Sequence, residues 1–335
     1  RTENAVGHVL CHDMTQIIPG VSKGPRFRKG HVVTEEDIPV LLSMGKENLF
    51  VWEMEPGMVH ENDAAERLAA LCGRENMTWS ETKEGKIELK SAIEGVFLVD
   101  SARLFAVNSI DELMIATRRG GGTVHPGDKL AGTRVIPLII REEKLRQAEQ
   151  AAGSAPLLSV RPFVRRTAAV ITTGSEVAKG RIPDSFTPVV ERKLAAFGIR
   201  MTEHILVEDG QENVLEAIEQ MKRRPVDMIL CTGGMSVDPD DSTPGAIKAS
   251  GADIVTYGAP VLPGAMFLLG YYGDGRPVMG LPGCVMYAKA TIFDLVLPRI
   301  AADVRLEKRD FVVFGEGGLC LGCESCTYPH CGFGR

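Results

Sequence analysis

Residues 226–243 read VDMILCTGGMSVDPDDST, an apolar run that ends in two glycines and continues into a serine and three aspartates. The apolar run has the length of a buried strand, and the turn residues that follow it mark the end of that strand. Glycines at a strand end let backbone amides approach an oxyanion closely, and a following helix N-terminus adds partial positive charge. Carboxylates at such an edge suit Mg²⁺ together with a phosphate. The stretch therefore predicts a strand whose carboxyl end binds a phosphorylated ligand.

The chain around this stretch alternates strands with helices from about residue 167 to 305. Strands are predicted at 167–174, 200–209, 226–234 and 277–283, and helices at 185–198, 211–224, from Thr243-Pro244 onward and at 285–300. Such alternation implies parallel crossover units and a doubly wound, three-layer αβα sheet, in which ligands bind beyond the carboxyl ends of the strands.

The remainder of the chain has a different pattern. We expect a β-rich segment at 1–60 with a short helix at 34–45, and a mixed α/β or β-rich region at 61–165. Within that region helices are predicted at 63–72, 109–118 and 141–152, and strands at 93–100 and 133–140. The α/β domain then covers 166–305, and a Cys-rich tail covers 306–335.

Bulk properties exclude several classes of protein. The 335 residues are 44% hydrophobic and 24% charged, with a net charge of −6, so a basic nucleic-acid-binding surface is not expected. No apolar run reaches the roughly 18 residues that a membrane span needs, and the first residues lack the pattern of a signal peptide. We expect a cytoplasmic protein.

The strand ends carry the candidate site. Each feature also has a simple structural explanation, since glycines form turns and aspartates cap helices. Their occurrence at several strand ends favours a functional site. Neither GxGxxG nor a P-loop motif is present, which disfavours a dinucleotide or ATP site.

Four of these motifs carry a resemblance. TTGSEV with GRIPDS, ILVED, CTGGMSVDPDDST and GLPG, in this order, resemble the molybdopterin-binding domain of molybdenum-cofactor biosynthesis proteins. The upstream half is similar to the β-rich domain of the MoeA and gephyrin-like molybdotransferases. The resemblance implies catalytic roles for Glu176, Asp209 and Asp241, with Asp241 and Glu176 holding Mg²⁺. It implies cofactor binding by Thr173, Gly174, Ser175, Asp184, Ser185, Thr232, Gly233, Gly234, Ser236, Pro282 and Gly283.

The implied reaction inserts molybdate into adenylated molybdopterin and releases AMP, in a protein that is expected to form homo-oligomers. Two alternatives stay open: a non-catalytic carrier that delivers the cofactor to a molybdoenzyme apoprotein, and a nucleotide pyrophosphatase of the competence-damage type. Four departures from the transferase pattern favour a binding or delivery role, and one of them is that the S-x-MDGYA segment of full-length transferases does not occur. Asp238 replaces a glycine, Cys284 follows GLPG, and residues 260–268 lack the expected lysine.

The last sixteen residues hold four of the eight cysteines, as Cys320, Cys323, Cys326 and Cys331. This spacing is typical of four thiolates around Zn²⁺ or an iron–sulfur cluster, and the close first three cysteines favour the cluster. The alternative is a flexible, reduced tail.

Overall fold

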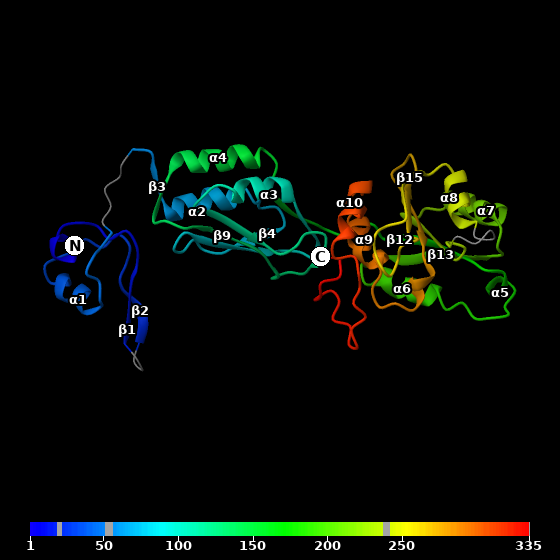
Figure 1. Cartoon of the computed structure of the whole chain (residues 1–335), viewed down its shortest axis with the longest axis horizontal. Coiled ribbons are helices and arrows are strands. Elements are labelled where there is room, and N and C mark those ends of the chain that lie inside the picture. Colours follow the sequence, from blue (N-terminus) through cyan, green and yellow to red (C-terminus); the bar gives the residue numbers. More distant parts are fainter. Residues whose placement is uncertain (19–21, 51–55, 237–241, 335) are drawn as a thin grey trace.

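The computed structural model of the chain describes residues 1–18, 22–50, 56–236 and 242–334. Three parts follow one another along the chain and along the long axis of the molecule (Figure 1). The N-terminal part contains the short helix η1 (Thr2–Asn4), the hairpin of β1 (Met14–Ile18) and β2 (Ser22–Phe27), and helix α1 (Asp37–Ser43). It has its own small hydrophobic cluster, which includes the fully buried Leu41. The predicted helix at 34–45 is confirmed, with shorter bounds.

The middle part packs helices on antiparallel sheets. One sheet has the order β4-β5-β9-β7 and another the order β11-β6-β8, and β3 pairs with β10. Helices α2 and α3 cover the four-stranded sheet, and α4 packs on these two helices (Figure 1). The elements are β3 (Met58–His60), α2 (Glu61–Ala70), β4 (Met77–Trp79), β5 (Lys86–Ser91), β6 (Gly95–Val99), α3 (Ser101–Asn108), β7 (Leu113–Thr117), β8 (Thr123–Val124), β9 (Lys129–Val135), β10 (Ile139–Arg141), α4 (Glu142–Ala152) and β11 (Leu158–Arg161).

The predicted helix at 109–118 is wrong. The helix lies earlier, at α3, and residues 113–117 form strand β7, which pairs antiparallel with β9. Glu112 has a φ of +75°, a left-handed conformation that stops a helix from passing through it. Leu113 and Ile115 are buried while Met114 and Ala116 are exposed, which is the period of a half-buried strand.

The third part is built on a six-stranded sheet with the order β13-β12-β14-β17-β16-β15. The first four strands in this order are parallel, β16 runs antiparallel to β17, and β15 runs antiparallel to β16. Its elements are β12 (Thr167–Thr173), α5 (Ser175–Ala178), α6 (Thr187–Ala195), β13 (Arg200–Val207), α7 (Gln211–Lys222), β14 (Met228–Thr232), α8 (Thr243–Ala249), β15 (Asp253–Tyr257), β16 (Leu268–Tyr271), β17 (Pro277–Leu281), η2 (Gly283–Met286) and α9 (Ile292–Ala301).

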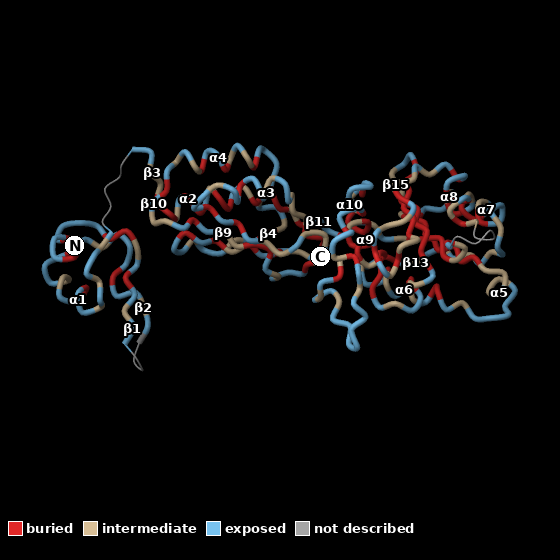
Figure 2. The backbone as a smooth tube through the Cα atoms, viewed as in Figure 1, coloured by how far each residue is buried: buried red, intermediate tan, exposed pale blue. Residues whose placement is uncertain are grey.

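Helices cover both faces of this sheet. Side chains of α6 and α9 share one hydrophobic cluster with β12, and those of α7 and α8 share another with β14. Strands β14 and β17 are buried at every position, as expected for central strands, whereas the edge strand β13 has no buried residue. Buried segments run through the interior of this part (red in Figure 2). The predicted doubly wound, three-layer α/β fold is therefore confirmed.

The predicted helix at 285–300 begins later than expected. Residues 283–286 form the 3₁₀ helix η2, and α9 starts at Ile292. Thr291 defines this start, because its hydroxyl accepts a hydrogen bond from the Phe293 amide and Asp294 accepts one from the Thr291 amide. Strands β15 and β16 were not predicted.

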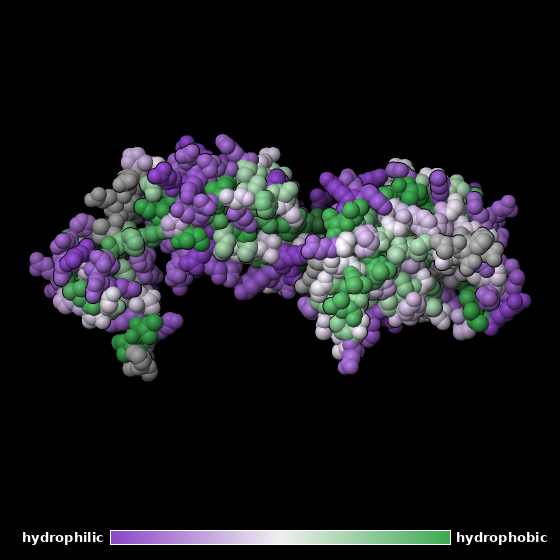
Figure 3. Space-filling model, viewed as in Figure 1, coloured by the Kyte–Doolittle hydropathy of each residue, from purple (hydrophilic) through white to green (hydrophobic). Residues whose placement is uncertain are grey.

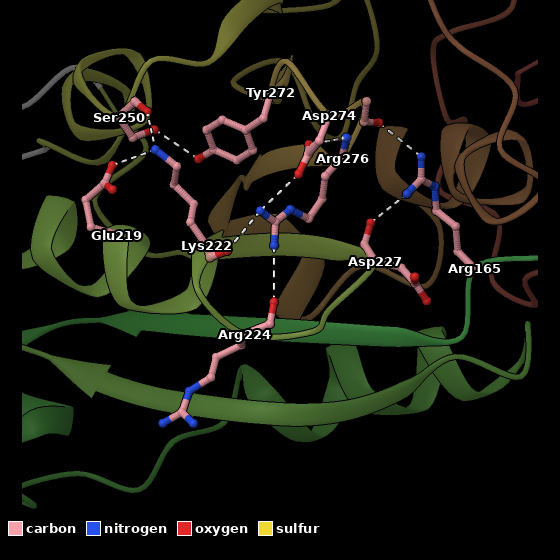
Figure 4. A network of polar contacts seen from close by, with 10 residues as sticks. Arg165, Glu219, Lys222, Arg224, Asp227, Ser250, Tyr272, Asp274 and Arg276 are labelled. Carbon is pink, nitrogen blue, oxygen red and sulfur yellow. Dashed lines mark hydrogen bonds and ion pairs between the residues drawn. The ribbon is translucent and has the colours of Figure 1, made fainter.

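At the amino edge of this sheet, a network of polar contacts connects α7 with the turn between β16 and β17 (Figure 4). The guanidinium of Arg276 donates to the carbonyl oxygens of Lys222 (3.0 Å), the last residue of α7, and of Arg224 (3.3 Å), two residues further on. Lys222 Nζ donates to the carbonyl of Ser250 at 2.8 Å, and the Ser250 hydroxyl lies 2.9 Å from that of Tyr272. The turn between β16 and β17 is thereby fixed to α7.

The chain continues through α10 (Lys308–Val312) and η3 (Val313–Gly315) into the tail, which lies on the third part. Leu319 forms a backbone bridge with Leu262, the Tyr328 hydroxyl donates to the Asp294 carbonyl at 3.1 Å, and Phe333 is buried. In the described part of the chain, no helix combines the length and the apolar character that crossing a membrane requires. On the face drawn in Figure 3, hydrophobic side chains form separate patches among hydrophilic ones.

Candidate functional site

The candidate site lies where the strand order of the sheet reverses. The chain passes from β12 to β13 on one side and later to β14 on the other side, so β12 and β14 flank the switch point. Thr172 pairs with Thr232, and Thr232 pairs with Leu281. The turns after β12, β14 and β17 therefore leave the sheet next to one another. Ligands of open α/β sheets bind in this position.

The turn after β14 requires glycine. Gly233 has a φ of +85°, and a Cβ placed there would lie 2.3 Å from the carbonyl oxygen of Thr173 and 2.5 Å from its hydroxyl. Gly234 follows with a φ of +57°. The Thr173 hydroxyl donates to the Thr232 carbonyl at 3.0 Å, which holds the ends of the two strands together. The requirement for glycine at position 233 is therefore steric.

Thr243 closes the same turn from its far end. Its hydroxyl donates to the Gly233 carbonyl at 2.9 Å, its amide donates to the Gly234 carbonyl at 3.2 Å, and the residue is fully buried at the start of α8. Ser236 is exposed on the turn. Residues 237–241, and with them the predicted metal ligand Asp241, lie outside the described residues.

The turn after β12 is fixed by Asp209. The Ser175 amide donates to the Asp209 carboxylate at 2.8 Å, and the Asp209 amide donates to the Ser175 hydroxyl oxygen at 3.3 Å. The structure therefore gives this carboxylate a partner in the backbone at the start of α5. Glu176, the next residue of α5, is exposed.

Asp184 is engaged in the same way at the start of α6. One carboxylate oxygen accepts from the amides of Phe186 (2.8 Å) and Thr187 (3.0 Å), and the other accepts from the Thr187 hydroxyl. Burial alone would raise the pKa of Asp184, but these hydrogen bonds outweigh it and lower the pKa below the usual 3.8. Ser185, its predicted partner, is exposed.

Three further polar residues join Asp184 and were missed by the sequence analysis. His204 Nε2 lies 3.0 Å from the Thr187 hydroxyl, 3.2 Å from the Thr172 hydroxyl and 3.6 Å from the Asp184 carboxylate. His204 lies on β13. Side chains of a strand alternate between the two faces of the sheet, so the sequence could have placed His204 on the same face as Thr202 and Leu206.

The turn after β17 completes the edge. Pro282 is buried and Gly283 is exposed at the start of η2. Gly280, the first glycine of GLPG, leaves room for Met235 of the neighbouring turn, since a Cβ at Gly280 would lie 2.5 Å from the Met235 sulfur. The structure thus brings the predicted residues of three turns to one edge.

In the part of the chain that the structure describes, the predicted cysteine ligands are not placed together to hold a metal ion. Within the described ranges, no group of three or more His, Cys, Asp or Glu side chains is placed to hold a metal ion. Cys323 and Cys326 are exposed, Cys320 and Cys331 are half-buried, and all four thiols are free. The tail that carries these thiols is held on the third part by the buried Phe333 and by the hydrogen bond of Tyr328 to Asp294.

A doubly wound α/β domain with glycine turns at its switch point is the class of domain in which phosphorylated ligands bind at the strand ends. Residues 169–302 match the sequence model of a family described as "Probable molybdopterin binding domain". Residues 1–53 match a second model, described as "Domain of unknown function (DUF8806)".

Known proteins resemble parts of this chain. A Bacillus cereus (strain AH187) protein named "Putative competence-damage inducible protein" is 33% identical over 90 residues, which are 27% of this chain and 22% of that protein. A Bacillus anthracis protein of the same name gives the same values. The chain thus spans about a fifth of the length of these relatives.

Two solved structures are also similar. The protein CinA of Thermoplasma acidophilum, whose function is described as unknown, has a TM-score of 0.36 at 20% identity, covering 41% of this chain and 98% of its own. The molybdopterin biosynthesis enzyme MoaB of Thermus thermophilus has a TM-score of 0.33 at 17% identity, covering 42% and 98%.

Proposed function

We propose that the carboxyl edge of the third part binds the phosphate of molybdopterin or of its adenylated form. The observation that carries this proposal is the turn at Gly233. This turn has no room for a side chain at position 233, and it lies at the switch point of the sheet. Ser175 accepts a hydrogen bond from the Asp209 amide and keeps its own hydroxyl hydrogen for a ligand, and Ser236 is exposed on the turn after β14. The match of residues 169–302 to the model of a probable molybdopterin binding domain supports molybdopterin as that ligand.

The reaction that we propose for this site is molybdate insertion into adenylated molybdopterin with release of AMP. Mg²⁺ is part of this proposal, with Glu176 and Asp241 as its ligands. Glu176 is exposed on α5, and Asp209 is less suited because it already accepts the Ser175 amide. When bound, the metal would supply positive charge to the phosphate oxygens. Asp184 and Asp209 act on the backbone of the turns and so position the ligand.

Two other functions remain as alternatives. A carrier would bind the same cofactor and deliver it to a molybdoenzyme apoprotein without turnover, which the absence of a lysine in residues 260–268 favours. A nucleotide pyrophosphatase of the competence-damage type is supported by the 33% identity to the Bacillus proteins. We also propose self-association, as the resemblance to the molybdotransferases implies.

A titration separates these functions. We expect the purified protein to bind adenylated molybdopterin in the presence of Mg²⁺ and to release AMP when molybdate is added. Binding without AMP release identifies a carrier, whereas AMP release from ordinary dinucleotides identifies a pyrophosphatase. If neither the pterin nor its adenylate binds, the proposed function is wrong.

The Ser236→Ala variant tests the turn itself. We expect its Kd for the adenylate to rise about tenfold, because a hydrogen bond to a charged phosphate is lost. Ser154→Ala is the matched control, since Ser154 is equally exposed but lies in the middle part. Equal affinities of the two variants would contradict a role for Ser236.

We propose a second site in the tail, where Cys320, Cys323, Cys326 and Cys331 would hold Zn²⁺ or an iron–sulfur cluster. The half-buried Cys320 and Cys331 pack against the same hydrophobic cluster, and the other two thiols are exposed. Anaerobically purified protein is expected to contain zinc or iron by elemental analysis, and the double variant Cys323→Ser, Cys326→Ser is expected to lose it. Cys72→Ser, which changes a buried thiol elsewhere, should keep it. Wild-type protein without either metal would refute this site.

A further inference from the structure

A small cavity lies at the amino edge of the six-stranded sheet, opposite the candidate ligand site. Its volume is about 210 Å³, and its walls include Arg165, Tyr271, Pro277, Ile300, Asp303 and Arg305. Pro277 is the first residue of β17 and pairs with Tyr271, the last residue of the antiparallel β16. Arg165 lies two residues before β12. The cavity is therefore separate from the glycine turns.

Arg165 brings positive charge to the back of this cavity. Its side chain is 14% exposed, and its guanidinium donates to the carbonyl oxygens of Asp227 (2.7 Å, Figure 4) and Gly275 (3.1 Å) and to the carboxylate of Asp303 (2.6 Å). Its Nε is buried and has no hydrogen-bond partner among the described residues. Because Gly275 and Asp303 also line the cavity, the guanidinium end of Arg165 lies at the cavity wall.

Arg305 adds a second cation at the mouth. Its guanidinium carbon lies 4.4 Å from the centre of the Tyr271 ring, and its side chain is 59% exposed. The one ion pair that it forms within the described residues, with Asp253, is 3.9 Å long. Two guanidinium groups thus face the cavity with one carboxylate, Asp303, on its wall.

Tyr271 supplies a neutral donor. Its hydroxyl oxygen accepts the Leu306 amide at 3.1 Å, and no acceptor for its hydroxyl hydrogen is found within the described part of the chain. Burial raises the pKa of Tyr271 above its usual value, so the hydroxyl keeps its hydrogen at neutral pH.

We propose that this cavity binds a small tetrahedral oxyanion, with phosphate as the representative. The donors come from three separate segments of the chain, and a tetrahedral anion presents acceptors in several directions, whereas a carboxylate presents them in one plane. The cavity is smaller than the 300 Å³ or more typical of sites for drug-sized ligands, which excludes a whole nucleotide. The oxyanion site does not depend on the proposed function of the carboxyl edge.

Calorimetric titration with inorganic phosphate at constant ionic strength tests the proposal. We expect the Kd of the wild-type protein to rise about tenfold in Arg305→Gln, which removes a charged donor, and about fivefold in Tyr271→Phe, which removes a neutral one. Arg309→Gln is the control, because Arg309 is 82% exposed on α10 and pairs with Glu307. Its Kd should stay within about twofold of wild type.

Phosphate binding at the glycine turns would be a separate event, and Ser236→Ala identifies it. If phosphate binding is weakened by Ser236→Ala but not by Arg305→Gln, the oxyanion site is refuted while the proposed function stands. If acetate binds as tightly as phosphate, the preference for a tetrahedral anion is wrong. Wild-type protein that binds no phosphate, or equal Kd values for Arg305→Gln and Arg309→Gln, would also overturn the proposal.

Discussion

Replacing Gly233 by alanine is expected to lower the free energy of unfolding by about 3 kcal/mol and to abolish binding of adenylated molybdopterin. The left-handed φ of +85° costs an L-residue about 1 kcal/mol or more. The new methyl group would also lie 2.3 Å from the Thr173 carbonyl oxygen, a contact that real Cβ atoms do not make. Strain of this kind costs a further 1–3 kcal/mol or so, because β12 or β14 must move. Urea denaturation measures the stability change.

Gly251→Ala separates the two causes. Gly251 has nearly the same φ, +83°, but a Cβ there would meet no atom within 4 Å. We expect this variant to lose only about 1 kcal/mol and to bind the ligand normally. Equal stability losses for the two variants would show that the backbone conformation alone accounts for the effect, and that the close approach to Thr173 is unimportant.

The central strands of the third part could be predicted because a strand that is buried on both faces needs apolar side chains at nearly every position, which appears in the sequence as an unbroken apolar run. β14 reads MILCT, is buried throughout and is followed by two glycines, so both its type and its end are marked in the sequence. β16 reads LLGY and has only four residues with a glycine inside, so no pattern separates it from a loop. Its pairing with β17 depends on contacts that lie outside its own sequence.

The strand ends that carry the candidate residues were predictable, but what the side chains of Asp209 and Asp184 contact was not. An aspartate after a strand can bind a ligand, a metal or a backbone amide, and the residue type is the same in each case. The structure shows that Asp209 accepts the Ser175 amide and that Asp184 accepts two amides and a hydroxyl. His204 is far from Asp184 in sequence, so its place beside that carboxylate follows from the sheet order and could not be read from spacing.

The Asp184→Ala variant is expected to lose about 2 kcal/mol of the free energy of unfolding at pH 7. Removing a carboxylate that accepts the amides at a helix start costs about 1 kcal/mol, and the hydroxyl of Thr187 loses one of its polar partners as well. Ser185→Ala is the neighbouring control, because Ser185 is exposed, and its stability should change by less than about 0.5 kcal/mol. Similar losses in both variants would argue that the loop, and not the carboxylate, is responsible.

Asp184→Asn isolates the charge, because it keeps an acceptor of the same shape. The pKa of Asp184 is lower in the folded protein than its ordinary 3.8, so the unfolded chain takes up a proton first as the pH falls. The stability that the charge contributes is therefore complete above about pH 4 to 5 and is lost as the pH falls through the lower folded value. Urea denaturation between pH 7 and pH 3 should show the difference between wild type and Asp184→Asn shrinking towards the acid end. A difference that stays constant over this range would mean that hydrogen-bond geometry, and not the charge of Asp184, holds the start of α6 against β12 and β13.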